Sequence, residues 1–201
     1  MSEYSYSSAA PSHTHSYLFA PALALAKRRP APRRVFELGC GSGGFANALD
    51  EAGYDVTAID ISESGVRHAK EAYPGCRFEV GSGYDDLAGK YGTFDLVISL
   101  EVVEHLYSPR LYAATVRDLL NPGGMAIIST PYHGYVKNLA LAASGRMDSH
   151  FTALWDHGHI KFWSRESLRA LFGEVGMREV EFHRVGRFSP LAKSMISVFE
   201  R

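Results

Sequence analysis

Short apolar runs alternate with segments whose apolar residues recur at helical spacing along residues 34–129. Five runs are predicted as strands, most of them buried on both faces. They are Arg34–Leu38, Tyr54–Asp60, Arg77–Val80, Phe94–Leu100 and Met125–Ser129. Helices are predicted at Gly43–Ala52, at Glu63–Tyr73 and, with a break near Pro109, at Glu101–Leu120, before a turn at Asn121–Gly124. This alternation predicts a parallel sheet covered by helices on both faces.

The C-terminal part departs from the alternation. A helix predicted at Ser164–Val175 is followed by two predicted strands, Glu179–Val185 and Ser194–Phe199. The connection between them is too short for a parallel crossover, so they form an antiparallel pair. The predicted fold class is therefore α/β: a Rossmann-like three-layer sandwich whose mostly parallel, seven-stranded sheet ends in an antiparallel hairpin.

The length of 201 residues suits one domain. Residues 1–15 are aperiodic and predicted to be a mobile tail, and His15–Lys27 is apolar enough for a short helix. Residues 16–201 are predicted to form a single domain. The connection at about 132–163 is unusually long, and most of the five histidines between positions 105 and 159 lie in it. Long connections are often lids, so a lid insertion is predicted there.

Charge and composition argue against a nucleic-acid-binding or membrane-spanning protein. The 21 basic and 22 acidic residues give a net charge of -1, which predicts neither a nucleic-acid surface nor an anionic-membrane surface. No apolar run approaches the roughly 20 residues of a membrane span. Cys40 and Cys76 have no disulfide or zinc spacing, which favours a reducing compartment. We expect a cytoplasmic protein without a membrane span; its oligomeric state is not predicted.

A glycine-rich loop, Glu37-Leu-Gly-Cys-Gly-Ser-Gly-Gly44, joins the first predicted strand to its helix. Glycines let a ligand approach the backbone closely, and a helix N-terminus offers free N–H groups. Asp60 ends the second strand near the spacing of about 20 residues expected of an acid that binds ribose hydroxyls. Since Gly39, Gly41 and Gly44 also satisfy the dinucleotide pattern GxGxxG, the loop alone is compatible with two cofactor classes.

Glu37 separates these two classes. A carboxylate gains nothing beside a pyrophosphate, whereas a ligand with a cationic amino group can use one. The chain is also short for a second, substrate-binding domain of a dehydrogenase. From about Arg34 to the C-terminus the sequence resembles class I S-adenosylmethionine-dependent methyltransferases, whose first motif is an acidic residue followed by GxGxG.

The resemblance implies roles for individual residues at the cofactor. Gly39, Gly41 and Gly43 would contact the methionine part with Glu37 close behind, and Asp60 would bind the ribose. The remaining cofactor-binding positions are Cys40, Leu100, and, near the adenine, Ile61 and Ser82. Ser82 stands where the family often has an acid. The alternative is an ordinary strand–helix turn in which Asp60 caps the next helix.

A second cluster follows the fourth strand, in Leu100-Glu-Val-Val-Glu-His-Leu106. If a helix begins there, Glu101, Glu104 and His105 share one face. Two carboxylates and an imidazole pointing together could hold a divalent cation. The alternative is that acids near a helix N-terminus complement its dipole, which does not account for His105.

This cluster and the late HxHxxFxS block that begins at His157 resemble two branches of the superfamily. These are the ubiquinone-biosynthesis O-methyltransferases and the 3′-terminal 2′-O-methyltransferases of small RNAs. The resemblance implies Glu101, Glu104 and His105 as ligands of Mg²⁺, Mn²⁺, Fe²⁺ or Zn²⁺, with His157 or His159 as the fourth. His105, His157 and His159 are the candidate catalytic residues.

The predicted function is S-adenosylmethionine-dependent methylation of a hydroxyl on a small molecule. A metal would lower the pKa of that hydroxyl, and a lid histidine would accept its proton. The alternatives are methylation of RNA 3′ ends, a cofactor-binding regulator without chemistry, and an NAD-linked oxidoreductase. Arg187, in the terminal hairpin, is a turn residue or a substrate contact. The acceptor is not identified.

Overall fold

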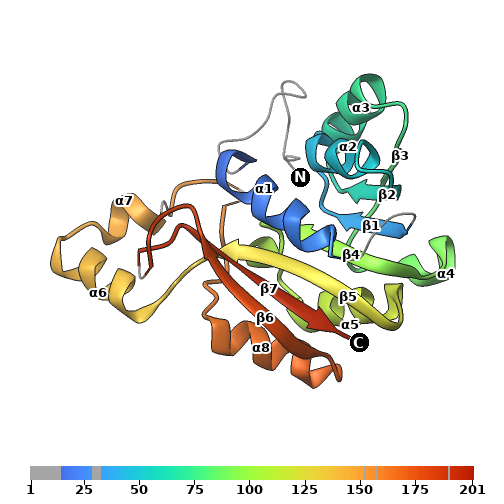
Figure 1. The fold of residues 1–201 in the computed structure, drawn as a ribbon. Coiled ribbons are helices and arrows are strands. Elements are labelled where there is room, and N and C mark those ends of the chain that lie inside the picture. The colour runs from blue at the N-terminus through green and yellow to red at the C-terminus, as the bar shows by residue number, and fades with distance from the viewer. Residues whose placement is uncertain (1–14, 29–32, 152, 157, 190) are drawn as a thin grey trace.

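In the computed structural model, one seven-stranded sheet has the order β3-β2-β1-β4-β5-β7-β6 (Figure 1). The structure describes residues 15–28, 33–151, 153–156, 158–189 and 191–201. The strands are β1 (Arg34–Leu38), β2 (Asp55–Asp60), β3 (Arg77–Val80), β4 (Phe94–Leu100), β5 (Leu120–Pro131), β6 (Arg178–Val185) and β7 (Ser194–Glu200). β1 to β5 pair in parallel, and β7 pairs antiparallel with both β5 and β6. The predicted fold class is confirmed.

Helices cover both faces of this sheet (Figure 1). They are α1 (His15–Ala26), α2 (Gly44–Asp50), α3 (Glu63–Ala72), α4 (Leu87–Tyr91), the 3₁₀ helix η1 (Val103–His105), α5 (Pro109–Leu119), α6 (Tyr135–Ala143), α7 (Met147–Phe151) and α8 (Arg165–Glu174). Apolar side chains of α1, α2 and α3 belong to one core cluster, and those of α4, α5 and α8 belong to the other. The central strands β1 and β4 are buried on both faces, which explains their continuous apolar runs.

The helix predicted from Glu101 does not form. Glu101 has φ 57°, the only positive φ among the described non-glycine residues, and the chain makes one short 3₁₀ helix over Val103–His105 before α5 begins. Pro109 is at the start of α5, where its missing N–H costs no hydrogen bond. The prediction that Glu101, Glu104 and His105 share the face of one α-helix is therefore wrong.

Two smaller features also differ from the sequence predictions. The turn expected at Asn121–Gly124 lies inside β5, and the pairing of β4 with β5 shifts register between Phe94 and Leu96. The polar segment after β3 contains α4, whose first turn is capped by the Asp86 side chain. The predicted tail lies outside the described residues except for His15, which begins α1.

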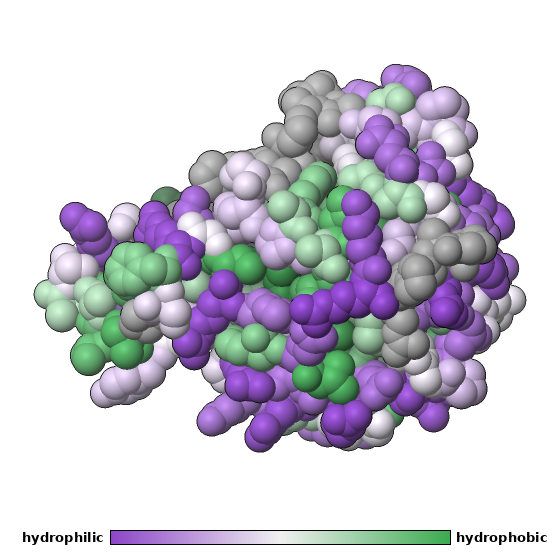
Figure 2. Space-filling model, viewed as in Figure 1, coloured by the Kyte–Doolittle hydropathy of each residue, from purple (hydrophilic) through white to green (hydrophobic). Residues whose placement is uncertain are grey.

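The carboxyl ends of the parallel strands meet at one edge of the sheet, where ligands bind in open α/β folds. The glycine loop after β1, Asp60 at the end of β2 and Glu101 after β4 all lie at this edge. From the end of β5, α6 and α7 project away from the sheet, and neither helix contains a buried residue (Figures 1 and 2). Within the described ranges, no helix is long and apolar enough to cross a membrane.

Candidate active site

The glycine loop is drawn tightly against the end of β2. The N–H groups of Gly39 and Cys40 both donate to the Ile59 carbonyl, at 2.8 and 2.9 Å. Gly39 has φ +85°, and a Cβ added to it would overlap the Val102 side chain. This close approach places the loop directly beside the chain that leaves β4. Since Glu104 follows Val102 by two residues, the glycine loop and the chain that carries Glu104 lie in one region.

Asp60 is oriented by the backbone around it. Its Oδ2 accepts the N–H of Gly41 at 2.8 Å, and its Oδ1 accepts the N–H of Ser62 at 2.8 Å. Each carboxylate oxygen has a second lone pair. The carboxylate is thus fixed at the end of β2 with capacity to accept further hydrogen bonds, as its expected ribose contact requires.

Glu37 is a buried carboxyl directly behind the loop, with 3% of its surface exposed. Its Oε2 has no hydrogen-bond partner among the described residues. Burial, and then the negative charge of Asp60, raise its pKa to about 8. An unpartnered buried oxygen is costly unless a ligand completes its hydrogen bonding. A cationic amino group would satisfy this oxygen and favour its charged form.

The other expected cofactor positions lie around the same edge. Ile61 follows β2 and is 64% exposed, while Leu100 at the end of β4 is half-buried and Cys40 is buried. Ser82 follows β3, and its N–H donates to Asp85 Oδ2 at 2.8 Å. The pairing of β2 with β3 brings Ile61 and Ser82 to neighbouring strand ends. Their roles at the adenine stay predictions.

Gly39→Ala tests the tight loop. We expect loss of S-adenosylhomocysteine binding in calorimetry and a lower free energy of unfolding, because alanine both strains the left-handed backbone, at about 1–2 kcal/mol, and overlaps Val102. Gly176→Ala is the matched control, since Gly176 has φ +80° but nothing within 4 Å of an added Cβ. Equal cofactor affinity in the two variants would contradict the role of the loop.

Glu104, His105 and His159 form the cluster that a metal ion could occupy. One ligand atom from each lies within 4.8 Å of the others, and His159 Nε2 is 4.0 Å from Glu104 Oε1. Glu104 is fully buried, and neither carboxylate oxygen has a hydrogen-bond partner among the described residues. His105 Nδ1 lies 3.2 Å from the Gly158 carbonyl. His157, the other candidate ligand, lies outside the described residues.

Glu101 is not part of this three-residue cluster, and its carboxylate is hydrogen-bonded to two serines. Ser129 Oγ donates to its Oε1 at 2.8 Å, and Ser194 Oγ donates to its Oε2 at 3.1 Å. The Glu101 N–H also donates to the Ser129 backbone, which fixes its unusual φ. Neither serine was predicted as a site residue from the sequence; the available signal was a hydroxyl side chain in each of two otherwise apolar strands, β5 and β7.

The charges in the cluster depend on burial. Burial, and then the charge of Glu101, raise the pKa of Glu104 well above its usual value, while burial raises the pKa of Glu101 to about 7. Burial, and then the nearby His105, lower the pKa of His159 to about 4. A cation would relieve the repulsion between the two carboxylates, and a neutral imidazole is the form that binds metals.

The two ends of residues 132–163 are anchored to the body of the protein. At the C-terminal end, the N–H groups of Ile160 and Lys161 donate to the Glu104 carbonyl, and Trp163 Nε1 donates to the Val103 carbonyl. At the N-terminal end, the Tyr132 N–H donates to the Lys193 carbonyl. The part between the anchors carries α6 and α7.

A cavity of about 550 Å³ lies within this segment and adjoins the cluster at His159. Its lining residues are His133, Asn138, Phe151, Ala153, His159 and Phe162. The His133 ring stacks on Phe151 and meets the edge of Phe162, with centroids 5.8 and 5.1 Å apart. The volume lies within the range of small-molecule sites. His159 belongs to both the cavity and the Glu104 cluster, so a molecule in the cavity would reach that cluster.

Comparison with known proteins supports this assignment of the strand edge. A family model described as a methyltransferase domain matches residues 12–181. The ubiquinone biosynthesis O-methyltransferase of Caulobacter vibrioides is 34% identical over 168 residues, which are 76% of this chain and 65% of that protein. The protein of the same name from Caulobacter sp. strain K31 is 33% identical over 150 residues, covering 70% of this chain and 58% of the relative.

The chain thus spans less than two thirds of the length of these two relatives. Among solved structures, the N-methyltransferase NodS of Bradyrhizobium japonicum, in complex with S-adenosyl-L-homocysteine, has the same fold with a TM-score of 0.68. It is 17% identical, and the match covers 91% of this chain and 85% of NodS.

Proposed function

The chain belongs to the S-adenosylmethionine-dependent methyltransferases, and we propose that it methylates a hydroxyl group of a small molecule with the help of a divalent metal ion. The observation that carries this proposal is Glu104. Its fully buried carboxyl group has no hydrogen-bond partner among the described residues and lies beside two imidazoles, one of which, His159, lines a small cavity. The O-methyltransferase names of the relatives favour oxygen as the acceptor atom.

The residues of the cluster fit a divalent ion. Glu104 offers hard oxygens, and His105 and His159 offer imidazole nitrogens, which suit Mg²⁺, Mn²⁺, Fe²⁺ or Zn²⁺ better than a thiolate-seeking ion. When bound, such an ion would act as a Lewis acid that lowers the pKa of the acceptor hydroxyl. Glu101 is the further carboxylate near this set, and each of its oxygens already accepts one hydrogen bond, from Ser129 and from Ser194.

The remaining steps are cofactor binding, orientation of the acceptor and removal of its proton, and different residues of the chain perform them. The sulfonium of the cofactor already carries an activated methyl group, so the protein must align the acceptor and exclude water. Glu37, Asp60 and the glycine loop hold the cofactor. The aromatic walls of the cavity orient the acceptor, and a lid histidine that does not hold the metal accepts its proton. Of the two histidines that line the cavity, His133 is outside the metal cluster and can take this role.

Metal dependence is the direct test. With catechol as probe acceptor, EDTA should suppress turnover, and one of the four ions should restore it. Calorimetry of each ion with the protein gives a readout independent of turnover. His159→Ala should abolish ion binding, whereas His157→Ala should not if His159 is the fourth ligand. Full activity in exhaustively chelated protein would remove the metal from this proposal.

Deletion of Ala140–Ser149 tests the lid. Since no residue of α6 or α7 is buried, the deletion should abolish turnover but leave the fold and S-adenosylhomocysteine affinity largely intact. Thermal unfolding and calorimetry measure the two properties separately. Cooperative unfolding of the variant under native conditions would instead identify the segment as part of the core.

A further inference from the structure

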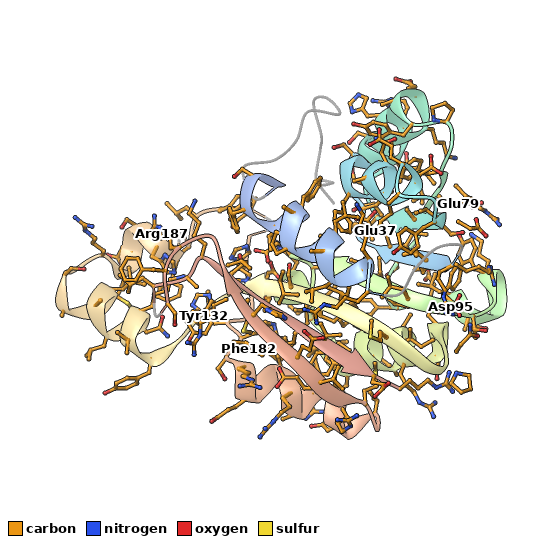
Figure 3. All side chains as sticks on the ribbon, viewed as in Figure 1. Glu37, Glu79, Asp95, Tyr132, Phe182 and Arg187 are labelled. Carbon is orange, nitrogen blue, oxygen red and sulfur yellow. The ribbon has the colours of Figure 1, made fainter. Side chains whose placement is uncertain are left out.

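Positive charge is concentrated on two neighbouring segments of a chain whose net charge is -1. Residues 132–163 together with the connection 184–193 contain six basic residues and two acidic ones. The basic residues are Lys137, Arg146, Lys161, Arg184, Arg187 and Lys193, and the acidic ones are Asp148 and Asp156. Figure 3 shows Arg187 and Tyr132 on the side of the molecule from which α6 and α7 project. The net charge of the whole chain does not reveal this local excess of positive charge.

Lys137, on α6, is the central cation of this region. It is half-buried, and its ammonium donates to the Tyr132 carbonyl at 2.9 Å. Among the described residues, no carboxylate lies within ion-pair distance of it. Glu101 is the acidic group whose charge reaches Lys137, but its two oxygens accept hydrogen bonds from serines. Lys137 therefore has unused capacity for an anionic partner.

The end of β6 and the β6–β7 connection add positive charge beside Tyr132, the residue whose carbonyl accepts the Lys137 ammonium. Burial, and then the charge of Arg187, lower the pKa of Lys137. The Arg184 guanidinium lies over the Tyr132 ring, 5.0 Å from its centroid. Arg187 itself is exposed and can reach a ligand. Two cations whose charges repel each other favour a nearby anion.

Lys137 is next to a lining residue of the acceptor cavity along the chain. Asn138, the residue after Lys137, and His133 both line the cavity. Burial, and then the positive charge of Lys137, lower the pKa of His133 to about 4. The charge of Lys137 therefore acts on a residue that lines the cavity. Charge-assisted hydrogen bonds to carboxylate or phosphate oxygens are among the stronger polar contacts.

We propose that Lys137 and Arg187 form an anion subsite at the rim of this cavity, which binds a carboxylate or phosphate group carried by the methyl acceptor. The subsite names a class of acceptor and so rests on the proposed function, but it binds its anion whether or not a methyl group is transferred. It lies outside the glycine loop and the Glu104 cluster, and it assigns the turn residue Arg187 to acceptor binding.

Matched catechols test the subsite. Calorimetry with S-adenosylhomocysteine present should show that 3,4-dihydroxybenzoate binds about 10- to 100-fold more tightly than the neutral 3,4-dihydroxybenzamide. 3,4-Dihydroxyphenylphosphonate then decides between carboxylate and phosphate. Lys137→Met and Arg187→Gln should each reduce the preference for the anion, and Lys137→Arg should restore most of it. Arg146→Gln, an exposed cation of the same segment, is the control and should keep the full preference.

The outcomes separate this proposal from the proposed function. Equal affinity for the acid and the amide, or a preference unchanged in both Lys137→Met and Arg187→Gln, overturns the subsite. Methylation of all three catechols with equal kcat/KM also overturns it while supporting O-methylation. Tight, Lys137-dependent binding of the acid without any methylated product supports the subsite and contradicts O-methylation. Since Arg187 is exposed, Arg187→Gln keeps the test valid even if Lys137→Met folds poorly.

Discussion

Glu104→Gln is expected to lower kcat by roughly 10²–10³-fold, the range seen when one group that stabilises a transition state is removed. The amide has the shape of the carboxyl group but cannot bind a cation as a carboxylate does. Because burial raises the pKa of Glu104 well above its usual value and so favours the neutral acid, which the amide resembles, the free energy of unfolding should change by about 1 kcal/mol or less. Affinity for S-adenosylhomocysteine should stay unchanged.

Differential scanning fluorimetry with Mn²⁺ provides a second readout. The metal should raise the melting temperature of the wild-type protein and not that of Glu104→Gln. Glu101→Gln is the informative comparison: a lost metal shift there would mean that Glu101 leaves its serine partners to become a ligand. If Glu104→Gln keeps both turnover and the metal shift, the residue only complements a helix end, at about 0.3–1 kcal/mol.

Strands were the easiest part of the fold to predict. β1, β3 and β4 have the predicted bounds, because a short apolar run between turn residues has few alternatives. The antiparallel β6–β7 pair followed from the length of its connection. α4 was missed because five residues are too few for a helical period to be visible.

The chain after β4 could not be predicted, because long-range contacts decide its conformation. The Glu101 N–H donates to Ser129 on β5 and so does not start a helix. Its carboxylate is then held by Ser194, 93 positions away along the chain. Local spacing placed Glu101, Glu104 and His105 together, whereas the structure groups Glu104 and His105 with His159. Only the folding of residues 132–163 brings that histidine to η1.

Glu37→Gln is expected to move stability and cofactor affinity in opposite directions. The pKa of the Glu37 carboxyl group is about 8 in the folded protein, against a reference value of 4.5. Between these values the folded state holds one more proton than the unfolded state, so this group makes stability fall as pH rises from about 4.5 to 8. Glutamine removes this loss, which amounts to at most roughly 5 kcal/mol at pH 8.5. Urea unfolding at pH 6 and pH 8.5 should show the gain mainly at the higher pH.

The same substitution should weaken S-adenosylhomocysteine binding by about 10- to 100-fold, since a neutral amide cannot balance the cationic amino group of the ligand. Glu79→Gln, on β3, is the control substitution (Figure 3). The pKa of Glu79 is lowered, first by a hydrogen bond from Arg77. The small contribution of this carboxylate to stability is therefore lost as pH falls. That variant should bind the cofactor normally. If Glu37→Gln is instead destabilised at pH 8.5 and binds the cofactor as the wild type does, Glu37 is a structural carboxyl and the cofactor's amino group is held elsewhere.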